Sequence, residues 1–190
     1  MPSFTGSIMP PAQYPSLKGK TAYVTGGAGG IGEAICEAFA RNGTDVGILD
    51  INETAANAVA EKLVATGIRA KACGCDLRDI AELQSALDRL KAELGPADIL
   101  VNNAAHDQRH DWRDMTPAYW DERMAVNLRH MFFAMQKVAP WMIERHGGSI
   151  INFSSTSWKL KMATLPAYTT AKAAVHGLTK SFQMELGKSN

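Results

Sequence analysis

The sequence predicts an α/β fold: a doubly wound parallel sheet in a single domain. Short apolar runs rich in β-branched residues alternate with longer segments of helical period. Continuous apolar strands separated by amphipathic helices pack as a parallel sheet covered on both faces. The 190 residues, 46% of them apolar, are enough for one substantial core. A second full domain is therefore not expected.

The elements can be assigned in chain order. Residues 1–16, with four prolines, are expected to form a flexible arm, and residues 17–190 the domain. Apolar runs predict strands over 21–25, 45–50, 68–73, 98–102 and 149–153. Helical periodicity predicts helices over about 31–41, 53–65, 80–94 and 117–145, and a last helix that carries Tyr168 and continues to about 186.

The composition excludes several classes of partner. The net charge is +1, from 20 basic and 19 acidic residues, and no basic block interrupts the chain. Binding to nucleic acid or to a membrane surface therefore has no electrostatic support. No stretch resembles a secretory signal or reaches membrane-spanning length, so a cytoplasmic protein is expected. Cys36, Cys73 and Cys75 match no metal or redox pattern and are expected to be reduced and buried.

A glycine-rich turn, residues 26–32, separates the first strand from the first helix. Gly27, Gly29 and Gly32 fit the pattern G-x-G-x-x-G, while Gly26, Gly30 and Gly32 fit T-G-x-x-x-G-x-G from Thr25. Glycine suits this position because a pyrophosphate approaches the N–H groups of a helix N-terminus, where a Cβ would collide. Because a strand precedes this turn and a helix follows it, the sequence predicts a Rossmann-type dinucleotide site.

The second strand ends in Asp50, 18 residues after Gly32. This is close to the spacing of the acid that binds the adenosine ribose hydroxyls. A carboxylate repels a 2′-phosphate, and neither Ile51 nor Asn52 adds a positive charge, so NAD is the expected cofactor. The alternative interpretation of Asp50 is an N-terminal cap of the next helix.

A polar group near the end of the chain is suited to proton transfer. Tyr168 and Lys172 stand one helical turn apart, on one helical face. The positive charge favours the ionised phenol, which can then act as a general base. Ser155 follows the fifth strand, where α/β sheets place ligands. Taken alone, a Tyr-x-x-x-Lys pair is more often a surface pair of a helix.

The glycine turn, Ser155 and the Tyr168–Lys172 pair occur together with Asp76, the run Asn102-Asn103-Ala104-Ala105 and Asn127. In this order and spacing these motifs resemble the classical short-chain dehydrogenase/reductase family. The resemblance implies that Tyr168 is the acid/base, that Lys172 promotes its ionisation and holds the nicotinamide ribose, and that Ser155 orients the reacting oxygen. Asn127 would shape a proton-relay water chain. Ala105 stands where the family usually has glycine, which is tolerable at negative φ. The implied cofactor-binding residues are Gly26, Gly29, Gly30, Ile31, Gly32, Asp50, Ile51, Asp76, Leu77, Asn103, Ala104, Tyr168 and Lys172.

Segments 14–20, 107–110, 119–123, 126–131 and 152–158 are similar to a subgroup of bacterial NAD-dependent aldose 1-dehydrogenases. This implies a small-molecule alcohol or aldose substrate, with D-xylose or a related sugar oxidised at C1 to the lactone. Polar and aromatic groups suit a polyol. An internal ion-pair network in the loop is the alternative, and no metal site is expected. The expected substrate residues are His106, Asp107, Arg109, His110, Ser155, Trp158 and Tyr168.

The resemblance also implies a homodimer or homotetramer built through the two long helices. Family members usually continue beyond the position of Asn190 with two more strands and a substrate-covering segment. The fifth strand is therefore expected to be an exposed sheet edge, prone to aggregation. Two alternatives stay open: a dehydrogenase for another alcohol, such as a steroid, a 3-oxoacyl thioester or another sugar, and an NAD-binding module without turnover.

Overall fold

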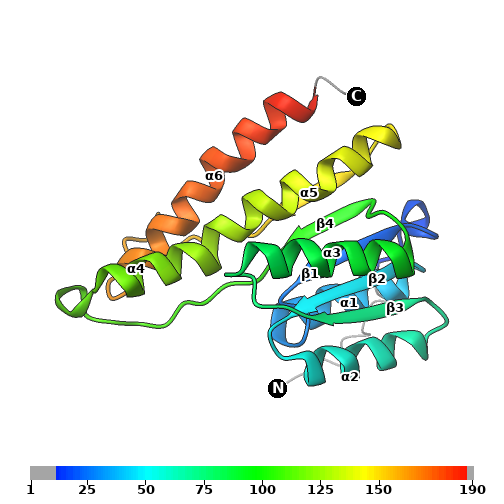
Figure 1. Cartoon of the computed structure of the whole chain (residues 1–190), viewed down its shortest axis with the longest axis horizontal. Helices are drawn as coiled ribbons and strands as arrows, with labels where there is room; N and C mark the ends of the chain where they lie inside the picture. Colours follow the sequence, from blue (N-terminus) through cyan, green and yellow to red (C-terminus); the bar gives the residue numbers. More distant parts are fainter. Residues whose placement is uncertain (1–11, 188–190) are drawn as a thin grey trace, which may run out of the picture.

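A five-stranded parallel sheet forms the centre of the molecule (Figure 1). The computed structural model describes residues 12–187. The strand order is β3-β2-β1-β4-β5, so the chain winds outward in both directions from β1 and reverses between β1 and β4. The predicted fold class is confirmed. The strands are β1 (Thr21–Thr25), β2 (Asp45–Asp50), β3 (Ala70–Gly74), β4 (Ile99–Asn102) and β5 (Ser149–Asn152).

Helices cover both faces of this sheet, because successive strand side chains alternate between the faces. One apolar core lies between the sheet and α1 and α2, and it includes Val24 and Ile48. The other lies between the sheet and α3 and α5, and it includes Tyr23 and Leu49. The helices are α1 (Gly30–Arg41), α2 (Glu53–Val64), α3 (Ile80–Leu94), α4 (Pro117–Met124), α5 (His130–Glu144) and α6 (Pro166–Leu186).

The expected long helix over 117–145 is interrupted by a π-helical segment, η3 (Ala125–Arg129), between α4 and α5. Single π turns inside helices are frequent at functional sites. The third strand begins two residues later than predicted, since Arg69 is engaged by Asp45, with Nη2 2.7 Å from Oδ2. The three cysteines are buried and free, as expected.

Most of the expected N-terminal arm lies outside the described residues. Within them, Pro15–Leu17 form a 3₁₀-helix, η1. The Tyr14 N–H donates to Oδ1 of Asn42, 2.6 Å away at the end of α1. This part of the arm is thus attached to the domain, and differs from the loose segment that its prolines suggested.

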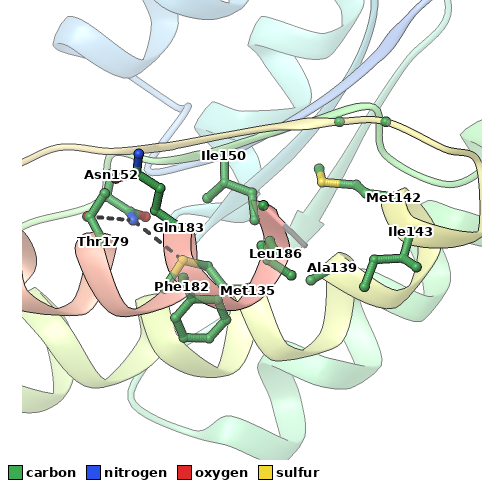
Figure 2. A pocket seen from close by; sticks show the side chains of 13 residues that line it. Met135, Ala139, Met142, Ile143, Ile150, Asn152, Thr179, Phe182, Gln183 and Leu186 are labelled. Atoms are coloured by element: carbon green, nitrogen blue, oxygen red, sulfur yellow. Dashed lines mark hydrogen bonds between the residues drawn. The ribbon is translucent and has the colours of Figure 1, made fainter. Parts of the chain in front are cut away.

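β5 is an edge strand, and Ile151 on it is 44% exposed. Figure 1 shows α5 and α6 running side by side next to this edge. Between them and β5 lies a groove of about 340 Å³. Figure 2 shows Met135, Ile150, Phe182 and Leu186 around it, with Asn152 bonded to Thr179 at one end. None of the helices in residues 12–187 has the length and apolar character needed to cross a membrane.

Candidate active site

A cavity of about 780 Å³ opens at the carboxyl ends of β1, β2, β3 and β4, beside the point where the strand order reverses. Open α/β sheets bind ligands at this place. Most of the cofactor-binding residues expected from the sequence lie in its wall, whereas Gly30, Tyr168 and Lys172 do not. The predicted residues in the wall are Gly26, Gly29, Ile31, Gly32, Asp50, Ile51, Asp76, Leu77, Asn103 and Ala104.

The glycines of the turn are needed for different reasons. A Cβ on Gly32 would lie 1.9 Å from the carbonyl oxygen of Gly26, so the first turn of α1 could not pack here. Gly26 has a φ of +67°, which favours glycine. Gly29 has extended backbone with a φ of −174°, and a Cβ there would meet no protein atom within 4 Å. The space beside Gly29 is therefore open. Gly29 itself lies at the N-terminus of α1 and in the wall of the cavity.

Asp50 ends β2 with both carboxylate oxygens engaged by the backbone. Oδ2 accepts the N–H of Ala28 at 2.9 Å, and Oδ1 accepts that of Asn52 at 3.0 Å. Asn52 is the N-cap of α2, and its own side chain accepts from Ala55 N–H. The capping interpretation of Asp50 is therefore wrong. A carboxylate has about four lone-pair sites, so Asp50 keeps acceptor capacity toward the cavity that it lines.

Asn103 ties the end of β4 to the glycine turn. Its Nδ2 donates to the carbonyl oxygens of Thr25 at 3.0 Å and Gly26 at 3.1 Å. The hydroxyl oxygen of Thr25 accepts the backbone N–H groups of Asn103 and Ala104. Ala105 is not among the described non-glycine residues with positive φ, so alanine fits this position.

The segment after β5 and helix α6 together hold the expected catalytic side chains. Lys172 is 1% exposed, and its Nζ donates to the carbonyl oxygen of Phe153 at 2.7 Å. Its backbone carbonyl accepts from Oγ of Ser154 at 2.7 Å. Nζ lies 5.8 Å from the ring centroid of Tyr168. Burial lowers the pKa of Lys172 from 10.5 to about 8, so the ammonium is a desolvated charge beside the phenol.

Ser155 and Tyr168 both keep hydrogen-bonding capacity. The Oγ of Ser155 accepts the N–H of Ser157 at 3.1 Å, which leaves its hydroxyl proton unused. The half-buried Tyr168 makes no hydrogen bond through its hydroxyl within the described chain. Both groups can therefore bind a reacting oxygen.

Asn127 lies in η3 and is fully buried. Its Oδ1 accepts the N–H of His106 at 2.8 Å, and its Nδ2 donates to the carbonyls of His106 and Arg123. The side chain is thus occupied in holding the loop after β4. His130, which the sequence analysis did not single out, is also fully buried, and burial and the charge of Lys172 lower its pKa to about 4.

The polar loop after β4 contacts the segment that follows Ser155. The guanidinium of Arg109 donates to Oγ1 of Thr164 at 3.1 Å, and the His110 N–H donates to the Thr164 carbonyl at 2.9 Å. No ion pair joins Asp107, Arg109 and His110 within residues 12–187, so the alternative of an internal ion-pair network is wrong. Trp158 packs edge-on against His176, with ring centroids 5.3 Å apart. No metal-binding cluster occurs in the described part of the chain.

A charged cluster in the cavity wall was not expected from the sequence. Arg78 pairs with Asp76 at 2.6 Å and with Glu122 at 3.0 Å, and Glu122 also binds Arg123. The Arg78 guanidinium holds the pKa of Asp76 below its usual value. Arg123 and Asn127 lie one turn apart in the sequence, and this spacing could have indicated that they share one helix face. Because an arginine on a helix is usually exposed to solvent, the spacing did not indicate a buried position for Arg123.

The chain belongs to the short chain dehydrogenase family, whose profile matches residues 20–190. It is 46% identical over 179 residues to D-xylose 1-dehydrogenase of Caulobacter vibrioides, a match of 94% of this chain and 71% of that protein. It is also 46% identical over 183 residues to a probable galactose dehydrogenase of Rhizobium meliloti, covering 96% of this chain and 72% of the relative.

Solved structures of the family show the same fold. A 7α-hydroxysteroid dehydrogenase complexed with NADH superimposes with a TM-score of 0.87 at 36% identity, over 92% of this chain and 68% of the other. An NAD⁺-bound xylitol dehydrogenase superimposes with a TM-score of 0.86 at 26% identity, over 92% and 67%. The two relatives at 46% identity support a sugar dehydrogenase in general.

Proposed function

We propose that this chain is an NAD-dependent oxidoreductase that oxidises D-xylose or a related aldose at C1 to the lactone. The observation that carries the proposal is the buried ammonium of Lys172 beside Tyr168, bonded to the backbone just before Ser155. A buried cation next to a phenol stabilises the phenolate that a general base requires. The same end of the sheet carries the cavity of about 780 Å³.

NAD fits the residues of that cavity. The open position of Gly29 at the N-terminus of α1 suits a pyrophosphate, and the acceptor capacity of Asp50 suits the ribose hydroxyls. As the family resemblance implies, Asp76 and Leu77 would contact the adenine, and Asn103 and Ala104 would belong to the turn that lies along the cofactor. When bound, NAD supplies the hydride acceptor. Asp50 would disfavour NADP, since its carboxylate would repel a 2′-phosphate.

The protein's own groups handle the proton and the orientation of the substrate. The hydroxyl of Ser155 donates to the anomeric oxygen and holds C1 in place. The phenolate of Tyr168 takes the proton of the anomeric hydroxyl as the C1–H bond breaks with its electron pair. Lys172 stabilises the phenolate before this step. Asn127 keeps the adjoining loop in position, and the implied relay returns the proton to solvent.

Support for a sugar comes from the loop and from the relatives. His106, Asp107, Arg109 and His110 supply polar groups, and Trp158 an aromatic one, in two segments that contact each other. The relatives named above are a D-xylose 1-dehydrogenase and a probable galactose dehydrogenase. A steroid or an acyl chain would find fewer apolar partners here. We further propose a cytoplasmic homodimer or homotetramer, by analogy with the family.

The test is NADH formation by the purified chain with NAD and either D-xylose, L-arabinose, D-glucose or a non-sugar alcohol. We expect turnover that is selective for a pentose. NAD binding without NADH formation would instead favour a binding module without turnover. Turnover of the non-sugar alcohol alone would favour a dehydrogenase of another specificity.

The variant Tyr168→Phe tests whether Tyr168 is the general base. We expect unchanged affinity for NAD and a fall in kcat of about a thousandfold or more, because the proton acceptor is lost while the aromatic ring remains. The matched control is Tyr14→Phe, because Tyr14 contacts Asn42 at the end of α1, away from the proposed active site. If Tyr168→Phe retained near-normal turnover, Tyr168 would not be the base.

A further inference from the structure

Arg78 lies in the wall of the cavity, and all three nitrogens of its guanidinium are engaged by carboxylates. Nε donates to Oδ1 of Asp76 at 2.9 Å and Nη2 to Oδ2 at 2.6 Å, while Nη1 donates to Oε1 of Glu122 at 3.0 Å. The backbone carbonyl of Arg78 accepts from Nη2 of Arg129 at 2.7 Å. These contacts on three sides hold the guanidinium in one plane and one orientation.

The edges of this guanidinium are occupied, yet the Arg78 side chain is still 41% exposed. The hydrogens of a guanidinium lie in its plane, so hydrogen bonds to carboxylates use the edges and leave the two faces free. Because Arg78 lines the cavity, the surface that it offers to a ligand there is mainly a flat face. Such faces stack on aromatic rings and on nucleobases.

The charges around Arg78 are poorly suited to a phosphate. Arg78 and Arg123 each carry a positive charge. Asp76 and Glu122, which bind them, each carry a negative charge, so the four side chains together have no net charge. A phosphate would gain little attraction here and would have to displace a carboxylate. An uncharged aromatic ring gains dispersion and cation–π attraction from the guanidinium face without displacing either partner.

The strand order places this surface at the end of the cavity where a base would lie. The glycine turn follows β1, Asp50 ends the neighbouring β2, and the segment with Arg78 follows β3, which is next in the sheet. NAD with its pyrophosphate at the glycine turn and its adenosine ribose at Asp50 would therefore direct its adenine toward the end of β3. Ile51 lines the same cavity and is 69% exposed, which offers the ring an apolar contact.

A second Asp-x-Arg turn in the chain provides an internal comparison. Arg113 binds Asp111 in the same way, with Nε 3.0 Å from Oδ1 and Nη2 2.7 Å from Oδ2. Its side chain is 71% exposed, and it lines neither the cavity nor the groove beside β5. The bond to Glu122 on α4 and the place in the cavity wall therefore distinguish Arg78 from Arg113.

We propose that the face of the Arg78 guanidinium, held between Asp76 and Glu122, is the platform on which the adenine ring of NAD stacks. The inference rests on the proposed function, which places NAD in this cavity. Asp76 and Glu122 act through Arg78 and position it. Stacking uses the face of the ring rather than its amino group, so the site accepts adenine rings that are altered at that group.

The binding test needs no turnover and uses calorimetric titration with AMP, NAD and nicotinamide mononucleotide. Arg78→Lys keeps the positive charge and removes the flat face. We expect Kd for AMP and NAD to rise about fivefold to tenfold, and Kd for nicotinamide mononucleotide, which has no adenine, to stay unchanged. Arg113→Lys is the matched control and should bind all three as the wild type does. An unchanged Kd for AMP in Arg78→Lys, or no binding of AMP to the wild-type chain, would overturn the proposal.

The spectroscopic test uses a fluorescent nucleotide, ethenoadenosine monophosphate, in which the amino group of adenine is blocked. We expect it to bind the wild-type chain, with quenching of its fluorescence by acrylamide reduced severalfold relative to the free nucleotide. In Arg78→Lys, at saturating protein, quenching should approach that of the free nucleotide. If the wild type bound AMP but not the etheno nucleotide, recognition would depend on the amino group and the proposal would be wrong.

The stacking proposal and the proposed function can fail separately. Absence of NADH formation, with AMP binding that is weakened by Arg78→Lys, would overturn the proposed function alone. NADH formation by the wild-type chain, with an equal Kd for AMP in Arg78→Lys, would overturn the stacking alone.

Discussion

Two glycines of the same turn differ in what they do. Gly32 has the Gly26 carbonyl against it, so it serves the packing of α1, whereas Gly29 borders open space in the cavity. Sequence patterns treat both alike. Only the tertiary contacts separate the glycine that the packing of α1 requires from the glycine that borders open space in the cavity.

Substitution by alanine should separate these roles. Gly29→Ala should leave the melting temperature unchanged, since its backbone is extended and its surroundings are open, and should weaken NAD binding about tenfold or more. Gly32→Ala should fail to fold stably. Calorimetric titration with NAD and thermal unfolding are the measurements. Full NAD affinity in Gly29→Ala would mean that no phosphate lies over this position.

Lys172 is a buried charge that the fold has to accommodate. Its pKa falls from 10.5 to about 8 on folding, so the charged form costs about 3 kcal/mol. The hydrogen bond to Phe153 returns about 1 kcal/mol. Active sites often keep such destabilising groups for function.

We therefore expect Lys172→Met to be more stable than the wild type by about 2 kcal/mol at pH 7, and inactive. Above about pH 8 the folded wild type loses this proton, while the unfolded chain keeps it until about pH 10.5. The stability advantage of the variant should therefore shrink as pH rises through this window. Urea unfolding at several pH values measures it, and a pH-independent difference would contradict the buried-charge account.

At the scale of elements, the π-helical segment η3 connects the apolar core to the loop that follows β4. It contains Asn127, whose buried side chain binds His106, and the buried His130 follows it as the first residue of α5. A regular helix over 117–145 was the expectation, because apolar spacing alone cannot reveal one extra residue in a turn. The π turn depends on contacts with the β4 loop and with α6, which are distant in sequence.

Asn127→Ala should loosen this connection. It leaves the backbone groups of His106 and the carbonyl of Arg123 without their partner, and we expect a loss of about 2 kcal/mol in unfolding free energy. Hydrogen exchange should accelerate in residues 104–110. Asn52→Ala, which removes the cap of α2, is the control: it should cost about 1 kcal/mol without affecting that loop. Equal rates of hydrogen exchange in residues 104–110 of both variants would contradict the role of Asn127 in holding this loop.

At the scale of the whole molecule, one of the two edges of the sheet, strand β5, lies beside an apolar groove. β5 pairs only with β4, and the groove lies between β5, α5 and α6 (Figure 2). The chain spans 71% of the length of its D-xylose dehydrogenase relative. An exposed strand with free N–H and C=O groups is a template for association with other chains.

A charge at this edge should reduce such association. Ile151→Lys replaces a side chain that is 44% exposed, so the fold should tolerate it with a change in stability within about 0.5 kcal/mol. We expect the concentration at which light scattering appears to increase severalfold. Val64→Lys, an exposed position on α2 away from the edge, is the control. Equal effects of both substitutions would point to net charge rather than to the edge.

Local sequence was sufficient to predict the architecture and to select the side chains that we propose to be catalytic. Strand and helix periodicity predicted the parallel sheet, and the glycine turn, Asp50 and the Tyr168–Lys172 pair were evident because each depends on spacing along the chain. Three features were not evident from the sequence. They are the contacts of Tyr119 with Arg123 and His110, the hydrogen bonds of Asn127 to His106, and the burial of Lys172. They arise where loops that follow different strands meet one helix face, and such contacts form only when the sheet brings distant segments together.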